Sequence, residues 1–333
     1  MKRVFQLISL LILVTVFFSC GNDTKKTFAR SSGKTAEMIV VTNNNTKWEG
    51  QVGEAIRTFF NQEYEVLPQP EPLFEMAHVA IAEFNNSKML QAHHNIFIVD
   101  IDPKAKESTI KARKDVWASP QYVINIVSPS EEDFIVFFEE KKEVVLGTLM
   151  DSEYARLIQT YKGFKDRGVI NSVKENFKLS MDIPSGFYIA KEIADFAWIR
   201  KETQHNSQAL LIYTYDFVDT LAFDKSRIIS FRNALTEEYI PGPAEGSYMV
   251  VAEDYAPVIS ERIDFKGMFA VRTKGLWRLE GDFMGGPFVN YTFVDEKSNK
   301  VITIDAYVYA PNKPKRDLLI QTETIIQSLK LVD

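Results

Sequence analysis

The hydrophobic pattern of this 333-residue chain changes near residue 183, and no other feature limits the fold as strongly. Before that point, short apolar runs alternate with segments of helical spacing. After it, strand-like runs follow one another, interrupted by two helical segments. Alternating strands and helices are typical of α/β domains, whereas successive strands with segregated helices are typical of α+β domains. The sequence therefore predicts an α+β protein, with an N-terminal α/β domain over residues 37–180 and a mostly antiparallel sheet packed with two helices over residues 181–333.

The first domain is predicted to contain four strands, at residues 38–41, 79–81, 96–99 and 122–127. A helix is expected to begin at Thr46, because Glu49 lies three positions on and completes a capping box. Residues 104–114 are expected to form a short charged helix. From residue 130 to about residue 178 the spacing predicts two or three helices, broken near Gly147, Gly163 and Gly168.

The second domain is predicted to be built from short strands, at residues 187–189, 196–199, 210–215, 268–273, 289–294 and 301–309. Residues 225–239 are expected to be helical, with prolines ending the segment. The chain is predicted to close with a helix, since Leu318, Ile325 and Leu329 follow helical spacing and Pro314 lies at its first turn.

The N-terminus has the parts of a secretory signal. Lys2 and Arg3 precede an apolar run from residue 4 to residue 18, and Ser19 follows as a small residue. That run is shorter than the roughly 20 residues that span a bilayer as a helix. We therefore expect residues 1–19 to be a signal peptide that is removed.

Cys20 follows this signal directly and is the only cysteine of the chain. The segment 17–20 resembles the bacterial lipoprotein box, although Phe17 stands where leucine is usual. The resemblance implies cleavage before Cys20 and lipid on its thiol; the alternative is an ordinary signal peptide with an incidental cysteine. Stable anchoring takes about two acyl chains, which a lipoprotein cysteine carries. We expect attachment to a membrane of the bacterial cell envelope, the outer membrane in particular.

Residues 20–36 are small and polar apart from Phe28, so a lipid-anchored tether is predicted there. The formal charge of the chain is −6, and removal of Lys2 and Arg3 makes it −8. Nucleic-acid binding needs a basic face, so this balance argues against a nucleic-acid partner. The expected partners are the membrane and an unidentified envelope protein or small ligand.

One ligand site follows from chain topology. If strands 38–41, 96–99 and 122–127 are parallel, their carboxyl ends meet at one edge of the sheet, where open α/β sheets bind ligands. Polar loops follow all three strands, and the alternative is that they are ordinary caps and turns. The ligand-binding residues predicted at this edge are Asn43, Asn45, Thr46, Asp100, Asp102 and Ser128.

No catalytic residue, metal site or cofactor is assigned from the sequence. His93 or His94 could join Asp100 or Asp102 in a metal site or a hydrolase cleft, and the competing interpretation is a solvated loop with a half-buried strand histidine. The Gly-x-Ser-x-Gly turn of many hydrolases does not occur in the sequence. The loop 281–287 is interpreted either as a contact surface with exposed Phe283 and Met284 or as a plain turn.

Two resemblances bear on the class of protein. The run 275–281, Gly-Leu-Trp-Arg-Leu-Glu-Gly, and the arrangement around it resemble a family of uncharacterised Bacteroidetes lipoproteins. The closing segment 307–311 and the helix after it resemble the end of the α/β/α sandwiches of PsbP-like and Mog1-like proteins. The first resemblance implies an envelope location and no particular activity. We therefore favour a non-enzymatic binding module, with an envelope hydrolase and a structural role in envelope assembly as alternatives.

Overall fold

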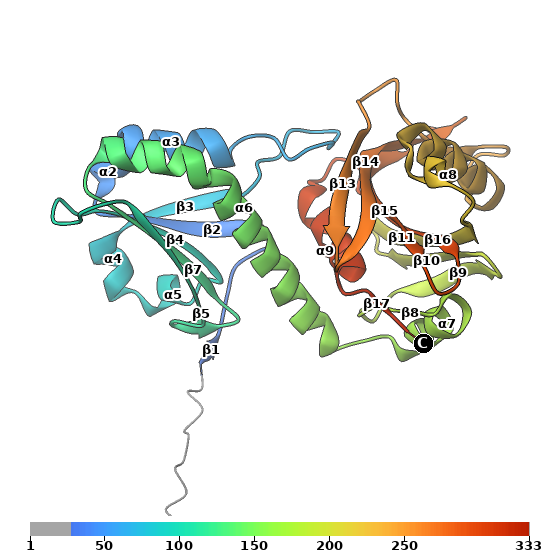
Figure 1. The fold of residues 1–333 in the computed structure, drawn as a ribbon, viewed down its shortest axis with the longest axis horizontal. Coiled ribbons are helices and arrows are strands. Elements are labelled where there is room, and N and C mark those ends of the chain that lie inside the picture. The colour runs from blue at the N-terminus through green and yellow to red at the C-terminus, as the bar shows by residue number, and fades with distance from the viewer. Residues whose placement is uncertain (1–27, 333) are drawn as a thin grey trace, which may run out of the picture.

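The computed structural model describes residues 28–332, so the predicted signal peptide and Cys20 lie outside the described residues. Figure 1 shows two lobes connected by the long helix α6 (Glu131–Lys162). The N-terminal lobe is an α/β domain and the C-terminal lobe is a curled antiparallel sheet with helices, which confirms the predicted α+β class. No helix of the described part is both long and apolar enough to cross a bilayer.

The sheet of the N-terminal lobe has five strands in the order β3-β2-β4-β7-β5. Their bounds are Glu75–Ala80 (β3), Glu37–Thr42 (β2), Asn95–Ile101 (β4), Tyr122–Ser128 (β7) and Thr109–Lys114 (β5). The first four are parallel, and β5 pairs antiparallel with β7 at the edge. The strands predicted at 38–41, 96–99 and 122–127 are thereby confirmed, whereas the one predicted at 79–81 is the end of β3 and Ile81 begins a helix. The carboxyl ends of β2, β4 and β7 share one edge.

Both faces of this sheet are covered, because residues along its buried strands alternate between two clusters. Met38 and Val40 pack with α3 (Gln51–Phe60) and α6 on one face. Ile39 and Val41 pack on the other face, beside α4 (Ile81–Asn86) and α5 (Lys88–Gln91). Parallel sheets are usually buried on both faces in this way.

Two local predictions in this lobe are wrong. Part of the segment 104–114 is the edge strand β5, because its backbone pairs with β7 and its charged side chains point to solvent; charged edge strands also resist pairing with other chains. The helix after β2 is α2 (Asn45–Glu49), and Asn44 caps it by accepting a hydrogen bond from the Lys47 amide at 3.0 Å. Thr46 is therefore inside the helix rather than its cap.

Helix α6 runs without interruption through Gly147, where a break was expected. A glycine inside a helix costs about 1 kcal/mol relative to alanine, which a 32-residue helix packed against both lobes tolerates. The next helix, α7 (Arg167–Phe177), and the short strand β8 (Leu179–Ser180) lie with the C-terminal lobe, where β8 pairs with β17 (Lys330–Leu331). The chain thus passes from one lobe to the other at the end of α6, upstream of residue 181.

The C-terminal sheet has eight antiparallel strands in the order β12-β14-β15-β16-β11-β10-β9, with β13 also paired to β14. Their bounds are Tyr188–Ile193 (β9), Phe196–Glu202 (β10), Ser207–Asp216 (β11), Tyr248–Val251 (β12), Ile259–Phe265 (β13), Met268–Glu280 (β14), Gly285–Asp295 (β15) and Lys300–Tyr309 (β16). Its helices are α8 (Lys225–Tyr239), α9 (Arg316–Gln327) and the single 3-10 turn η1 (Thr220–Phe223).

The two faces of this sheet belong to different apolar clusters. Ile199, Leu210 and Ile212 pack on the face that also contacts α9. Trp198 and Leu211, one position along in each strand, pack on the face that α8 covers. The alternation follows from the two-residue period of strands, and it places a row of aromatic side chains under and beyond α8.

A buried carboxylate joins the lobes. Glu323 of α9 accepts hydrogen bonds from the Tyr154 hydroxyl of α6 at 2.9 Å and from the Tyr291 hydroxyl of β15 at 2.6 Å. Glu71 of the N-terminal lobe accepts from the backbone amides of Lys315 and Arg316 at the start of α9. Side chains from both lobes therefore share partners at this interface.

The predicted tether is too long at its C-terminal end. β1 (Ala29–Arg30) pairs with β6 (Ala118–Ser119), and Ala36 is fully buried. Small, polar residues allow this segment to run close to the sheet domain, where its backbone groups find partners. The part of the tether prediction that concerns residues 20–27 lies outside the described residues.

Candidate functional site

The structure brings Asn43 and Asp100 together at the predicted sheet edge. The Asn43 amide nitrogen donates to Asp100 Oδ1 at 2.7 Å, and Asn43 Oδ1 accepts from the Ile101 amide at 2.8 Å. The carboxyl ends of β2 and β4 are thus tied to each other by one side chain. The same bonds occupy the Asn43 groups that a ligand would use.

The other predicted residues divide into two groups. Ser128 is buried; its hydroxyl accepts from Ser108 at 3.0 Å, and its carbonyl accepts from the Asp102 amide at 2.9 Å. Asp102 in turn accepts from the Lys104 amide at 2.9 Å. Asn45 and Thr46 are exposed on α2. None of the six lines any of five well-formed cavities of the described part, so their ligand role stays a prediction.

The paired histidines occupy a different place from the one predicted. His93 and His94 lie in the turn before β4, both are buried, and their rings stack with centroids 4.7 Å apart. The expectation of a solvated loop is wrong, because each ring has partners inside the protein. His94 Nδ1 lies 2.6 Å from the Ser32 carbonyl, and its Nε2 lies 2.9 Å from Glu153 of α6.

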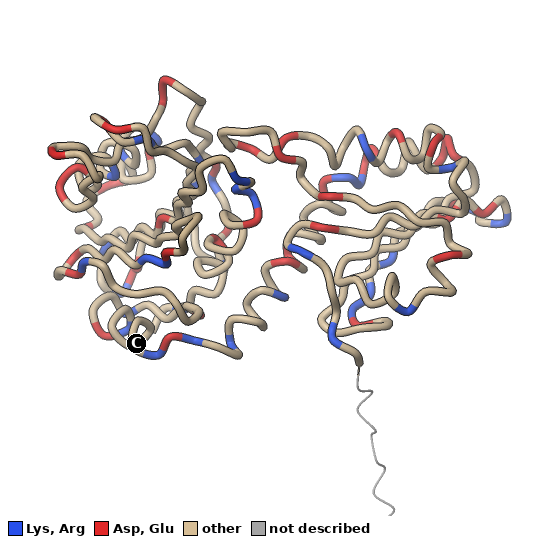
Figure 2. The backbone as a smooth tube through the Cα atoms, turned by 180° about the vertical axis from the view of Figure 1, so that it is seen from behind, with Lys and Arg blue, Asp and Glu red and all other residues tan. Residues whose placement is uncertain are grey.

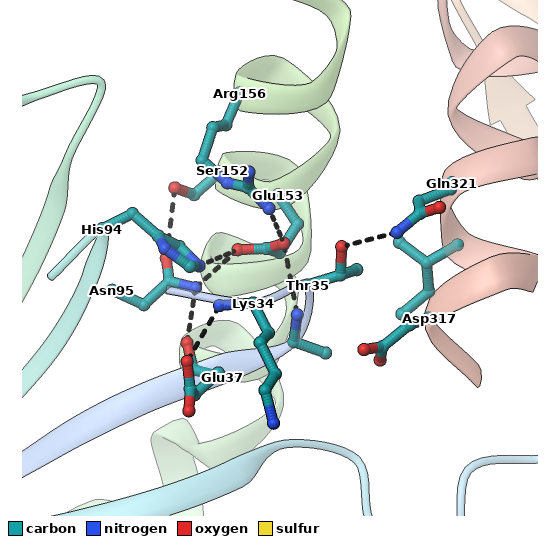
Figure 3. Close-up of polar contacts among 12 residues, drawn as sticks. Lys34, Thr35, Glu37, His94, Asn95, Ser152, Glu153, Arg156, Asp317 and Gln321 are labelled. Carbon is teal, nitrogen blue, oxygen red and sulfur yellow. Dashed lines mark hydrogen bonds and ion pairs between the residues drawn. The ribbon is translucent and has the colours of Figure 1, made fainter. Parts of the chain in front are cut away.

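Glu153 is the centre of this cluster, as Figure 3 shows. Its carboxylate contacts Arg156 at 2.6 Å and accepts from the Asn95 amide nitrogen at 2.6 Å and the Ala36 amide at 3.2 Å. Burial raises the pKa of Glu153, but the contacts with His94 and Arg156 outweigh burial and lower it to about 2. The carboxylate is therefore charged and fully paired, which is the usual state of a buried acid in a structural role.

The segment before β2 packs directly against the two histidines. Gly33 has a φ of +119°, and a Cβ atom there would lie 2.4 Å from the His94 ring. Only glycine permits this approach. The neighbouring Thr35 accepts a hydrogen bond from Gln321 of α9 at 3.2 Å, which Figure 3 also shows. The cluster thus fixes residues 32–36 to both lobes.

The histidine–aspartate pairing that the sequence suggested is not assembled. His94 precedes β4 and Asp100 lies near its end, so about six residues of strand, or roughly 20 Å, separate them. Among residues 28–332, no group of three or more His, Cys, Asp or Glu side chains is arranged to hold a metal ion.

A cavity with a different character lies in the C-terminal lobe. It has a volume of about 670 Å³ and opens on the sheet face that α8 covers only in part. Its aromatic and thioether lining comes from β10, β12, β14, β16 and the β14–β15 turn: Trp198, Met249, Trp277, Met284, Tyr307 and Tyr309. Ligand pockets of several hundred Å³ with mostly apolar walls and a few polar groups are the usual form of small-molecule sites.

Hydrogen bonds fix the aromatic walls. The Trp198 indole nitrogen donates to the Tyr307 hydroxyl at 2.8 Å, and the Trp277 indole nitrogen donates to the Val308 carbonyl at 3.2 Å. Burial raises the pKa of Tyr307, so its hydroxyl stays neutral. The rings therefore present hydrocarbon surface in a fixed orientation to whatever fills the cavity.

The mouth of the cavity is polar. Arg200 lies over the Trp198 ring at 4.4 Å and pairs with Glu202. His205 and Lys313 also line the cavity, and within the described part neither side chain makes a hydrogen bond or an ion pair. Unlike the polar edge of the N-terminal lobe, this mouth keeps a lysine and an imidazole available for a ligand.

The sequence pattern did not predict this cavity. Tyr307 and Tyr309 were expected only in a closing strand that resembles Mog1-like sandwiches, and Trp277 entered only through a family resemblance. A usable signal was present, since Trp198 and Arg200, Trp277 and Leu279, and Tyr307 and Tyr309 are pairs two residues apart that share one face of a strand. Aromatic side chains on the same face of three strands indicate more than ordinary core packing. Exposed Phe283 agrees with the interpretation of the loop 281–287 as a contact surface, whereas Met284 is partly buried.

Comparison with known proteins divides the chain where the lobes divide. Residues 31–162 match a family described as a domain of unknown function, DUF8532, and residues 166–328 match another, DUF4837. The two matches meet at the end of α6. A comparison with curated proteins finds no match.

Among solved structures, a mutant of the protein Mog1 is 10% identical with a TM-score of 0.30, covering 47% of this chain and 92% of that chain. The Ran-binding protein Mog1p of Saccharomyces cerevisiae is 10% identical with a TM-score of 0.32, covering 47% of this chain and 91% of its own. LpqN of Mycobacterium tuberculosis, described as involved in cell envelope biogenesis, is 11% identical with a TM-score of 0.28, covering 46% of this chain and 83% of its own. These matches agree with the predicted Mog1-like resemblance, and at this level of similarity they carry no argument about function. The Bacteroidetes lipoprotein origin stays a prediction.

Proposed function

We propose that this protein is a lipid-anchored component of the bacterial cell envelope that binds a small amphipathic ligand in the aromatic cavity of its C-terminal lobe. The observation that carries the proposal is that cavity, with two fixed tryptophans in its wall and the side chains of His205 and Lys313 at its mouth. The polar edge of the N-terminal sheet is a weaker candidate for the ligand site, because its polar groups are hydrogen-bonded to one another.

The lining defines the chemistry of the ligand. The walls formed by Trp198, Trp277 and Tyr307 fit a ring or another apolar body, since aromatic rings gain most from offset-stacked or edge contacts. His205 and Lys313 at the mouth fit an anionic or strongly polar head. A ligand with an apolar body and an acidic group satisfies both parts of the site.

Blocking the cavity tests this proposal. Met284→Trp places a larger side chain in the cavity, and Met89→Trp makes the same change at an exposed position of the other lobe. With 1-anilinonaphthalene-8-sulfonate as an aromatic anionic probe, we expect wild type and Met89→Trp to bind alike and Met284→Trp to bind at least about tenfold more weakly, a difference of about 1.4 kcal/mol. Equal binding by all three proteins would reject this cavity as the ligand site.

The anchor needs its own test, because Cys20 lies outside the described residues. Cys20→Ala should block lipidation and leave the protein uncut or released into the soluble fraction. Cell fractionation followed by a carbonate wash measures this. A variant that is cut and still stays with the washed membranes at the wild-type level would contradict the anchoring.

A further inference from the structure

An exposed apolar surface lies at the opposite end of the C-terminal sheet from the aromatic cavity. Phe223 packs edge-on against Phe269 with ring centroids 4.9 Å apart, and Phe217 lies 6.2 Å from Phe223. The exposed fractions around this group are large: 86% for Val218, 60% for Leu221, 52% for Phe269 and 41% for Leu331. Contiguous exposed apolar surface of this kind marks a contact with a partner or a membrane.

A hollow of about 700 Å³ lies beside these side chains. It is lined by the end of α7, the β13–β14 and β15–β16 turns and the C-terminal residues, including Phe177, Met268, Ile302 and Leu331. We call the hollow, the exposed side chains of Val218, Leu221, Phe269 and Leu331 around it, and the half-buried Phe217 and Phe223 the lower apolar surface.

Lysines border this surface. Lys178 lines the hollow, and Lys266 and Lys330 lie close enough to interact, since burial and then the charge of Lys330 lower the pKa of Lys266. Asp295 and Glu296 line another part of the hollow, and Asp295 is engaged by Ser298 within its own turn. Apolar side chains with lysines beside them form the usual surface of proteins that lie in the interface of a bilayer.

The start of the folded chain lies on the same side of the molecule. In Figure 1, β1, α7 and the C-terminus all lie along the lower edge, and Figure 2 shows the same edge from behind. Nine peptide units separate Cys20 from Ala29, so the lipid-bearing cysteine lies within about 30 Å of β1 at full extension. A membrane that holds Cys20 therefore lies within reach of the lower edge.

From these positions we propose that the lower apolar surface rests on the phospholipid bilayer in which Cys20 is anchored, so that the protein lies on the membrane at two points. This inference rests on the proposed lipid anchoring for its second point of attachment. Strand β11 connects the two ends, since Ser207 lines the aromatic cavity and Phe217, just past the strand, lines the hollow. Ten residues of strand span about 33 Å, so the aromatic cavity opens well away from the bilayer.

Vesicle binding by the unlipidated protein tests the surface separately from the anchor. The chain from residue 20 with Cys20→Ala contains every described residue, and the probe is large vesicles of equimolar phosphatidylethanolamine and phosphatidylglycerol. We expect this protein to sediment with the vesicles and the double variant Phe269→Glu/Leu331→Glu to bind at least about tenfold more weakly. The control Tyr255→Glu/Phe283→Glu changes two exposed aromatics, one in the β14–β15 turn, and should bind as the parent does. Circular dichroism and melting curves check that all three are folded.

The outcomes separate the two proposals. If the unlipidated protein fails to sediment, or the control variant loses binding as much as the test variant, the lower apolar surface is not a membrane contact, whether or not Cys20 carries lipid. If the vesicles bind as expected while Cys20→Ala is cut and still stays in washed membranes of cells, the surface stands and the lipid anchor fails. Binding to vesicles of phosphatidylcholine alone, which carry no net charge, measures how much of the affinity comes from the lysines. We expect this contribution to be smaller than that of the apolar side chains.

Discussion

The two lobes use their polar and apolar groups in opposite ways. In the N-terminal lobe, strand ends carry the polar residues expected of a ligand site, and Asn43, Asp100 and the neighbouring backbone satisfy one another. In the C-terminal lobe, a sheet face whose sequence pattern indicates ordinary core packing contains an open cavity with His205 and Lys313 at its mouth. It follows that a polar sheet edge is a candidate ligand site only when its polar groups lack hydrogen-bond partners within the protein.

Helix length accounts for much of this difference. α8 has 15 residues and is about 22 Å long, whereas β14 has 13 residues and spans about 43 Å. One helix therefore cannot cover the whole face, and the uncovered part holds the aromatic cavity. In the N-terminal lobe, α3 and α6 lie together on one face and bury it completely around Phe97 and Val99.

The largest effects are expected where each lobe buries an acid. In the C-terminal lobe, Asp305 pairs with Arg232 at 2.8 Å, and both are buried. Asp305→Leu leaves a buried guanidinium without its partner and should cost about 3–5 kcal/mol of the free energy of unfolding. Glu153→Leu should cost a similar amount in the N-terminal lobe. Urea unfolding measures both, and a loss below about 1 kcal/mol at either position would contradict its role as a buried pair.

Acid should weaken the N-terminal lobe through Glu153. Its pKa is lowered from 4.5 to about 2 in the folded protein, so the carboxylate stabilises the fold above the unfolded pKa, and this stabilisation is lost as the pH falls from about 4.5 to about 2. At 1.36 kcal/mol per pKa unit, the contribution is on the order of 3 kcal/mol. Glu153→Gln should flatten the pH dependence of stability in that window. If the variant and wild type lose stability in parallel, other groups cause the acid sensitivity.

Smaller losses of stability are expected at the polar edge of the N-terminal sheet. From sequence alone, Asn43→Ala looks neutral because loop changes usually stay within about 0.5 kcal/mol. The structure changes this expectation: Asn43 bridges β2 and β4, so its loss should cost about 1–2 kcal/mol. Asn44→Ala removes a helix cap and should cost about 1 kcal/mol, while Thr46→Ala should cost less. Thermal melts of the three variants rank them, and the reverse order for Asn44 and Thr46 would restore the original assignment of the cap.

The smallest effect is expected at Phe283. Its side chain is fully exposed, with a relative exposure of 106%, so Phe283→Ser should change stability by no more than about 0.5 kcal/mol. A large loss in a urea titration would mean that the loop 281–287 packs on the protein in solution.

Local pattern predicted most of the long strands but missed β5, β12 and β13. Continuous apolar runs such as residues 96–99 identify buried strands because side chains on both faces of a covered sheet must leave water. The charged segment 104–114 misled the same reasoning, since pairing with β7 is a long-range contact that no local spacing records. The predicted edge residues do follow parallel strands, but their mutual hydrogen bonds depend on side-chain geometry. The aromatic cavity depends on where α8 ends relative to β14 and β16, which only the fold determines.

The central claim is that the aromatic cavity, and not the polar edge, receives the ligand. The four tryptophans test it directly, because Trp198 and Trp277 line the cavity and Trp48 and Trp117 lie in the N-terminal lobe. Fluorine NMR of protein labelled with 5-fluorotryptophan, assigned by single Trp→Phe variants, gives one resonance for each. On titration with 1-anilinonaphthalene-8-sulfonate, we expect the resonances of Trp198 and Trp277 alone to shift. Shifts confined to Trp48, which lies on α2 beside the polar edge, would contradict it.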